Sequence, residues 1–214
     1  MRLRIVFIFI VALAVLPAAA RREPADTSAF VTSDRCIACH SGLHTSSGDD
    51  VSIGYDWRST IMANSGRDPY WHAAVRREVT DHPSAQAAIE DKCSTCHMPM
   101  ARFDAVTRGE QGQVFANISP AAPAHRKAFD GVSCTVCHQI TAANLGTHAS
   151  FDGGFEIERG TALGRRPVYG PHPVDEGRAS VMRSAAQFQS TESAHVRQSV
   201  PIEMSSPVGA VSCA

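Results

Sequence analysis

The sequence predicts a mainly α-helical fold with extensive loops and a few short strands, and three observations support this class. Capping residues and prolines bracket several short helical patterns. Clusters of glycine, serine and aspartate separate these patterns from one another. Aromatic residues make up only 7% of the 214 residues. Because aromatic side chains supply much of the volume of a core, side chains alone would fill this one poorly.

Three helices are predicted between residues 56 and 97, at 56–66, 69–81 and 85–97. Asp56 is the expected N-cap of the first helix, and Pro69 suits the first position of the second. The third helix is expected to stop where two closely spaced methionines flank a proline. We expect these helices to supply most of the regular structure.

The other segments carry weaker signals. Residues 21–35 are polar and are expected to lack regular structure. Residues 101–120 alternate weakly between apolar and polar positions and predict a short hairpin. A short helix is expected at 124–129, loops and short strands at 151–171, and a last helix at 175–186.

The N-terminus predicts export. Two arginines precede an apolar run at 5–16, and Ala18-Ala19-Ala20 follows it. This pattern is typical of a secretory signal peptide cut after Ala20, because the run is shorter than the ~20 residues that span a bilayer. An uncleaved membrane anchor is the alternative. We therefore expect a signal peptide at 1–20 and a periplasmic or otherwise exported chain with no later membrane span.

The charge balance limits the partners. The formal net charge is −1, and loss of the two arginines of the signal peptide makes the remaining chain more acidic. A nucleic-acid-binding protein normally carries a basic excess. Nucleic acid is therefore not an expected partner, and the sequence leaves the oligomeric state open.

Six of the seven cysteines fall into three copies of one pattern. The copies are Cys36-Ile-Ala-Cys39-His40, Cys93-Ser-Thr-Cys96-His97 and Cys134-Thr-Val-Cys137-His138. CxxCH is the attachment pattern of c-type haem: the two thiols add across the two vinyl groups of one porphyrin, and the adjacent histidine reaches the iron. The sequence therefore predicts three covalently attached haems that form the hydrophobic core, with His40, His97 and His138 as iron ligands.

Other uses of the same residues fit less well. A thiol–disulfide oxidoreductase has one CxxC in a thioredoxin-like βαβ pattern, which this chain lacks. A zinc ribbon uses CxxC pairs with histidine, but does not require histidine directly after every second cysteine. A disulfide framework has no need for that histidine either. The zinc site and the thiol–disulfide oxidoreductase remain as alternatives to haem.

A haem that transfers electrons needs a sixth ligand, usually histidine or methionine. Seven histidines lie outside the motifs, more than three haems require. His82 precedes the second motif at a helix end, and His125 precedes the third motif in a short helix. His195 is expected to serve a haem whose attachment motif is absent from this chain. These three histidines are the candidate distal ligands.

The segments between the motifs add a resemblance. The stretches 57–71, 88–100 and 130–140, together with Tyr169-Gly-Pro171, resemble multihaem cytochromes of the cytochrome c-554/c-prime-like family. The resemblance covers about residues 35–199 and implies exported electron carriers with closely packed, mostly histidine-ligated haems. It further implies a distal ligand at Met62, because related proteins carry histidine in the pattern Trp-x-x-Ser-x-His-Ala, where this chain has Met62 followed by Ala63. A thioether ligand raises the potential of the iron.

The C-terminus departs from this family. Proteins of the family continue into a further CxxCH after a segment like 193–199, whereas this chain ends in an atypical tail at 200–214 that contains Cys213. We interpret 21–199 as one multihaem domain and the tail as truncated or frameshifted. A free surface thiol at Cys213 is the alternative.

The predicted function is electron transfer through three haems to redox partner proteins. This function needs no catalytic side chain, and none is assigned. Two alternatives remain: an oxidoreductase that acts on a small nitrogen or sulfur compound at a five-coordinate haem, and a haem-based sensor or docking subunit. Arg67, Arg76 and His72 are the side chains that such an enzyme would have available to polarise its substrate.

Overall fold

The computed structural model describes residues 28–44, 47–50, 52–159, 166–170 and 182–185. The predicted signal peptide, His195, Cys213 and the tail at 200–214 lie outside these residues. Within the described part of the chain, no helix combines the length and the apolar character needed to cross a membrane.

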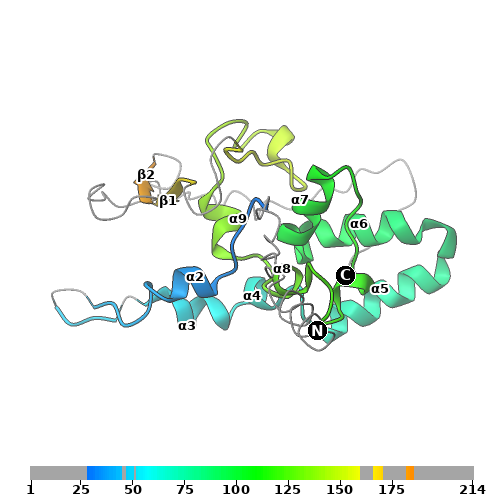
Figure 1. Cartoon of the computed structure of the whole chain (residues 1–214), viewed down its shortest axis with the longest axis horizontal. Coiled ribbons are helices and arrows are strands. Elements are labelled where there is room, and N and C mark those ends of the chain that lie inside the picture. The colour runs from blue at the N-terminus through cyan, green and yellow to red at the C-terminus, as the bar shows by residue number, and fades with distance from the viewer. Residues whose placement is uncertain (1–27, 45–46, 51, 160–165, 171–181, 186–214) are drawn as a thin grey trace, which may run out of the picture.

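The described chain is mainly helical with many loops, as predicted, and has a two-stranded sheet (Figure 1). The α-helices are α2 (Asp34–Ile37), α3 (Ile53–Arg58), α4 (Ile61–Asn64), α5 (Pro69–Asp81), α6 (Gln86–His97), α7 (Pro99–Thr107), α8 (His125–Phe129) and α9 (Cys134–His138). The 3₁₀ helices are η1 (Pro83–Ala85), η2 (Phe115–Asn117) and η3 (His148–Ser150). Strands β1 (Val168–Gly170) and β2 (Met182–Ser184) pair in parallel.

Helices α5 and α6 form a hairpin at one end of the molecule (Figure 1). The Oδ1 atom of Asp68 accepts a 2.9 Å hydrogen bond from the amide of Tyr70 and caps α5, and Pro69 occupies the first turn. His82 is the C-cap of α5, directly before Pro83. Asp68 and Pro69 satisfy or remove backbone donors at the start of α5, and Pro83 cannot continue the helix after His82. These local signals confirm the predicted bounds of α5.

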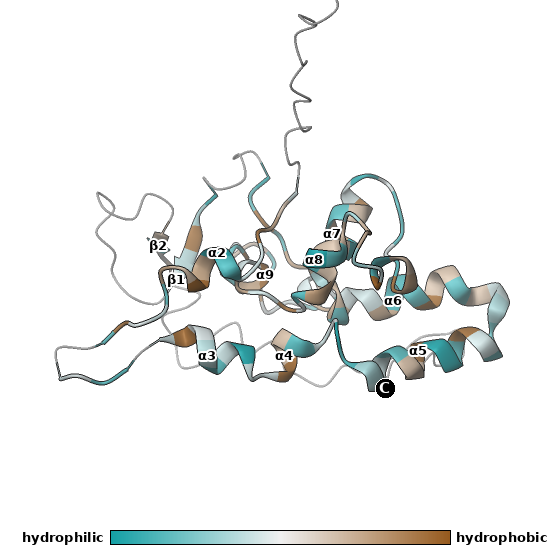
Figure 2. Ribbon diagram, turned by 60° about the horizontal axis from the view of Figure 1, so that its bottom comes forward, coloured by the Kyte–Doolittle hydropathy of each residue, from teal (hydrophilic) through white to brown (hydrophobic). Residues whose placement is uncertain are grey.

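One face of this hairpin builds the larger apolar core. Figure 2 shows polar and apolar residues alternating along α5, as a helix with one buried face requires. The core residues that α5 contributes are Trp71, Val75 and Val79, all buried. Ile89 and Met98 add apolar volume from α6 and the residue after it. Ala101 of α7, Val114 and Ala128 of α8 complete the cluster, so the core joins this hairpin to later parts of the chain.

Three element predictions were wrong. The predicted helix at 56–66 is two helices. Helix α3 already begins at Ile53, so Asp56 lies inside it and is not its N-cap. Helix α4 begins after Thr60, whose side chain accepts a hydrogen bond from the Ala63 amide. The segment 101–120 contains α7 rather than a hairpin, since Pro99 begins a helix there. Residues 182–184 of the predicted last helix form a strand that pairs with β1, while 175–181 lie outside the described residues.

A buried carboxylate ties α6 to the loop after α7. Glu90 is 7% exposed, and its Oε2 accepts hydrogen bonds from the amides of Val114 at 2.7 Å and Phe115 at 3.0 Å. Its Oε1 accepts a 2.7 Å bond from the Gln86 amide group. Because Val114 is fully buried, its amide has this carboxylate in place of water.

We expect Glu90→Ala to lower the free energy of unfolding by about 2–4 kcal/mol, because two backbone donors lose their acceptor in the interior. Urea unfolding of the full chain measures this loss. Glu90→Gln keeps one acceptor oxygen and should lose less. Glu110→Ala, which removes an exposed ion pair with Arg108, is the matched control with little expected change. Equal losses for Glu90→Ala and Glu110→Ala would contradict the role of Glu90.

Candidate cofactor site

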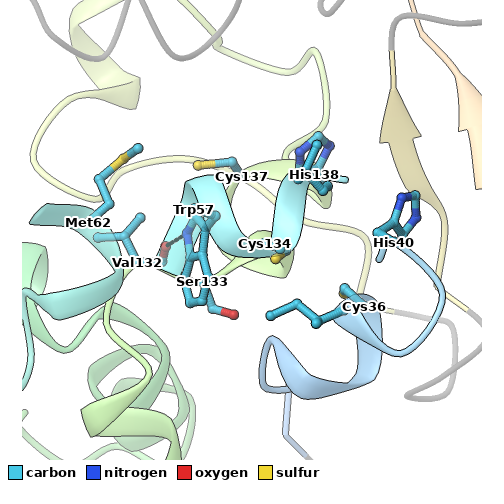
Figure 3. Close-up of a pocket in the computed structure, with 12 residues that line it drawn as sticks. Cys36, His40, Trp57, Met62, Val132, Ser133, Cys134, Cys137 and His138 are labelled. Carbon is cyan, nitrogen blue, oxygen red and sulfur yellow. Dashed lines mark hydrogen bonds between the residues drawn. The ribbon is translucent and has the colours of Figure 1, made fainter. Parts of the chain in front are cut away.

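The first and third CxxCH motifs line one cavity (Figure 3). The cavity has a volume of about 200 Å³ and an almost wholly apolar wall. Its lining comprises Cys36, Ile37, His40, Ile53, Gly54, Trp57, Met62, Val132, Ser133, Cys134, Cys137 and His138. Figure 3 shows Met62 at one end and His40 at the other, with α9 between them. Two motifs that are distant in sequence therefore share one site.

Hydrogen bonds that use no motif cysteine or histidine bring α2 and α9 together. The carboxylate of Asp130 accepts bonds from the amide and the hydroxyl of Ser33, both at 2.7 Å. The hydroxyl of Thr135 donates a 2.8 Å bond to the carbonyl of Val31. Ser33 and Thr135 are each 1% exposed, so water competes little for these bonds. They hold the start of α2 against the start of α9.

Gly131 lets α4 approach the same region. Its φ of +62° lies in the left-handed region, and a Cβ at this position would collide with the Met62 carbonyl and the Ser65 hydroxyl. The amide of Val132 donates a 3.0 Å bond to that Met62 carbonyl. Only glycine combines this backbone angle with this close approach. The contact places Met62 beside the third motif.

The four thiols of these two motifs differ in environment. The thiol of Cys134 donates a hydrogen bond to the sulfur of Cys36, which holds the pKa of Cys36 below its usual value and raises the pKa of Cys134 well above it. Burial raises the pKa of Cys137 to about 11. Cys39 is exposed. The first cysteine of one motif thus meets the first cysteine of the other.

The second motif lies apart from this cavity, at the end of α6. Its Cys96 is exposed and free, whereas Cys93 is buried and takes part in a disulfide. A thioether at Cys93 therefore requires that this disulfide be reduced first. The imidazole of His97 stacks on Trp71, with ring centroids 4.2 Å apart and planes within 1° of parallel. Burial lowers the pKa of His97 and favours its neutral form.

Three of the histidines expected to bind iron donate from Nδ1 to a backbone carbonyl. His97 bonds to Ser65 at 3.1 Å, His138 to Tyr169 at 2.6 Å and His125 to Asn117 at 2.9 Å. A carbonyl can only accept, so Nδ1 carries the proton in each case. Metal-ligating histidines commonly anchor one ring nitrogen in this way and present the other to the metal. The tautomer is therefore the one that iron ligation requires.

The predicted distal ligands lie in different places. Met62 lines the cavity and is 41% exposed. His82 is exposed at the turn before α6, whereas the second motif occupies the other end of that helix. His125 lines a separate polar cleft beside the start of α2. The structure therefore brings Met62 to the first and third motifs, and it does not bring His82 to the second motif.

The residues that line the shared cavity have the donor chemistry that haem requires, but the volume of the cavity is small. Two CxxCH thiol pairs, anchored imidazoles and an apolar wall are what covalent haem requires. The buried hydroxyl of Ser133 also has no partner in the structure. However, a cavity of about 200 Å³ is below the roughly 300–1,000 Å³ of pockets that enclose small organic ligands. The cavity between α2 and α9 is therefore too small to enclose a porphyrin.

No family model, no curated protein and no solved structure matches this chain. Among the described residues, no group of three or more histidine, cysteine, aspartate or glutamate side chains is placed to hold a metal ion. The assignment of the site consequently depends on its own residues.

Sequence reasoning missed the neighbours that orient the ligands. No motif in the sequence pairs Trp71 with His97, and Ser65 carries no signal because it contributes a backbone oxygen. Tyr169 stood out in the resemblance, yet nothing in the sequence paired it with His138. A backbone carbonyl leaves no trace in residue type, so only the fold reveals these contacts.

We expect the thiols of the reduced, haem-free chain to alkylate in a fixed order. Cys39 should react first because it is exposed. Cys137 should react at least about 100-fold more slowly than an ordinary thiol, because a pKa of about 11 instead of 9.0 depletes its thiolate. Iodoacetamide labelling followed by mass spectrometry measures the order. In urea all sites should react alike, and equal native rates for Cys39 and Cys137 would refute the buried site.

Proposed function

We propose that this chain is an exported multihaem c-type cytochrome of the cytochrome c-554/c-prime-like family that carries electrons through three covalently bound haems. The observation that supports this most is the cavity in which two of the three CxxCH motifs meet. Haems attached at Cys36/Cys39 and at Cys134/Cys137 would start from adjacent points of the fold. Short gaps between haems are the one structural requirement of a carrier.

In this proposal the chain's residues hold and orient the cofactor. The six motif cysteines attach three haems, and His40, His97 and His138 bind the iron atoms. The bond from His97 to Ser65 and the stacked Trp71 fix the plane of that imidazole. The bond from His138 to Tyr169 does the same at the third motif. When bound, the haems supply the one-electron chemistry and the hydrophobic core.

Met62 is the proposed distal ligand in the shared cavity, because it reaches the cavity wall beside the third motif. His125, which precedes the third motif, is a second proposed distal ligand, and its ring is held by a hydrogen bond to the Asn117 carbonyl. His82 and His195 remain predictions: the first lies away from the second motif, and the second lies outside the described residues. Redox proteins are the proposed partners, in a periplasmic or equivalent exported compartment.

We expect three haems per chain when the full gene is expressed with a c-type haem attachment system. Haem staining of a denaturing gel together with intact mass measures the number. Cys134→Ser combined with Cys137→Ser should leave two haems, because the third motif loses both thioethers. Cys213→Ser is the matched control and should leave three. A chain that carries no covalent haem would overturn the proposed function.

We expect Met62→His to lower one midpoint potential and leave the others in place, since imidazole stabilises ferric iron more than a thioether does. A spectroelectrochemical titration of the holoprotein measures the set of potentials. Met62→Leu should instead give one haem with an altered spin state. An unchanged set of midpoint potentials in both variants would contradict the assignment of Met62 as a distal ligand.

A second function is supported by the polar cleft near His125. The cleft, of about 400 Å³, is lined by Thr32, Ser33, Asp34, Arg58, Arg67, His125, Arg126, Phe129 and Asp130. Its arginines suit a small nitrogen or sulfur oxyanion at a haem with an open position. Electron paramagnetic resonance separates the two functions: low-spin signals alone support the carrier, whereas a high-spin ferric signal that responds to nitrite supports the enzyme.

A further inference from the structure

We propose that Cys36 and Cys134 form a disulfide in the haem-free chain, and that this bond is a redox-sensitive lock between the first and third motifs. The disulfide itself is independent of haem. Its consequence, that two attachment motifs are closed until the bond is reduced, rests on the proposed function.

The geometry places these two thiols together. Cys36 lies in α2 and Cys134 begins α9, and both line the shared cavity. Figure 3 shows the Cys134 side chain directed toward Cys36 on the facing helix. Each thiol also shifts the pKa of the other, lowering that of Cys36 and raising that of Cys134. The two cysteines therefore face the same small cavity from two docked helices.

The proximity of Cys36 and Cys134 is maintained by hydrogen bonds of neighbouring residues. The Asp130 carboxylate holds Ser33, three residues before Cys36, by two 2.7 Å bonds. Thr135, next to Cys134, is bonded to Val31. Both anchors lie outside the cysteine pair, so they hold the thiols close whatever the state of the sulfur atoms. An intramolecular pair held in this way has a high effective concentration.

Reagents can also reach the pair. Cys36 and Cys134 are partly exposed, whereas Cys137 is buried. Cys39 is exposed and lies three residues after Cys36, so a Cys36–Cys39 disulfide is the main alternative to the Cys36–Cys134 disulfide. The hydrogen bond to Cys36 comes from Cys134, which favours the link between motifs.

The reaction is thiol–disulfide exchange with a small disulfide such as oxidised glutathione. The Cys36 thiolate attacks one sulfur of that disulfide, forms a mixed disulfide and releases one glutathione thiolate. Cys134 then gives its proton to solvent and attacks the Cys36 sulfur, which releases the second glutathione thiolate. The two protein thiols lose two electrons in total, and the glutathione disulfide gains them. Export into an oxidising compartment supplies such reagents.

The test uses the full chain produced without haem attachment, reduced and then placed in a glutathione redox buffer. Trypsin cuts after Arg35, Arg58, Lys127 and Arg159, so Cys36 and Cys39 share peptide 36–58, and Cys134 and Cys137 share peptide 128–159. Non-reducing mass spectrometry should show these two peptides joined, with the loss of two hydrogen atoms. The joined species should be several-fold more abundant under native conditions than in urea.

Two double variants identify the cysteines. Cys39→Ser with Cys137→Ser should retain the joined peptides, and Cys36→Ser with Cys134→Ser, the matched control, should lose them. Equal yields in native buffer and in urea, or bonds only within each peptide, would overturn the inference. Haem counting on a separately matured sample tests the function by itself: a chain that takes haem but never joins these peptides contradicts the lock alone.

Discussion

The docking of α2 on α9 is the contact on which the rest of the site depends. Two bonds from Ser33 to Asp130 and one from Thr135 to Val31 join residues that are about 100 positions apart, and both donor side chains are buried. Buried bonds to a carboxylate are stronger than bonds between neutral groups. Ser33, Val31 and Asp130 lie just outside a CxxCH motif, and Thr135 is an intervening residue of the third motif. The docking therefore brings two motifs to one cavity without using their cysteines or histidines.

Several features of the cavity follow from this contact. Gly131 follows Asp130 directly, and its left-handed backbone brings α4 close enough to place Met62 at the cavity wall. Cys36 and Cys134 meet for the same reason, and their shared hydrogen bond gives two chemically similar thiols opposite pKa shifts. The same two cysteines therefore belong both to the proposed haem sites and to the proposed disulfide.

The second motif is organised differently. It belongs to the α5–α6 hairpin, and its histidine is oriented by Trp71 and by a backbone carbonyl. Helices α5 and α6 pack mainly on each other, and α6 packs on α7. The molecule therefore combines one site supported by local structure with one pair of sites assembled by long-range contacts.

Residue order alone was enough for the three CxxCH motifs, the mainly helical class and the bounds of α5 and α6, because capping residues, prolines and motif spacing act over a few positions. The hairpin predicted at 101–120 and the single helix predicted at 56–66 were wrong, because weak periodicity competed there with a proline start and a threonine cap. Three other points come from the folded arrangement: the first and third motifs meet, Met62 lies beside them, and His82 lies away from the second motif. These outcomes depend on contacts between distant segments, whose partners are backbone atoms and single side chains that leave no periodic pattern.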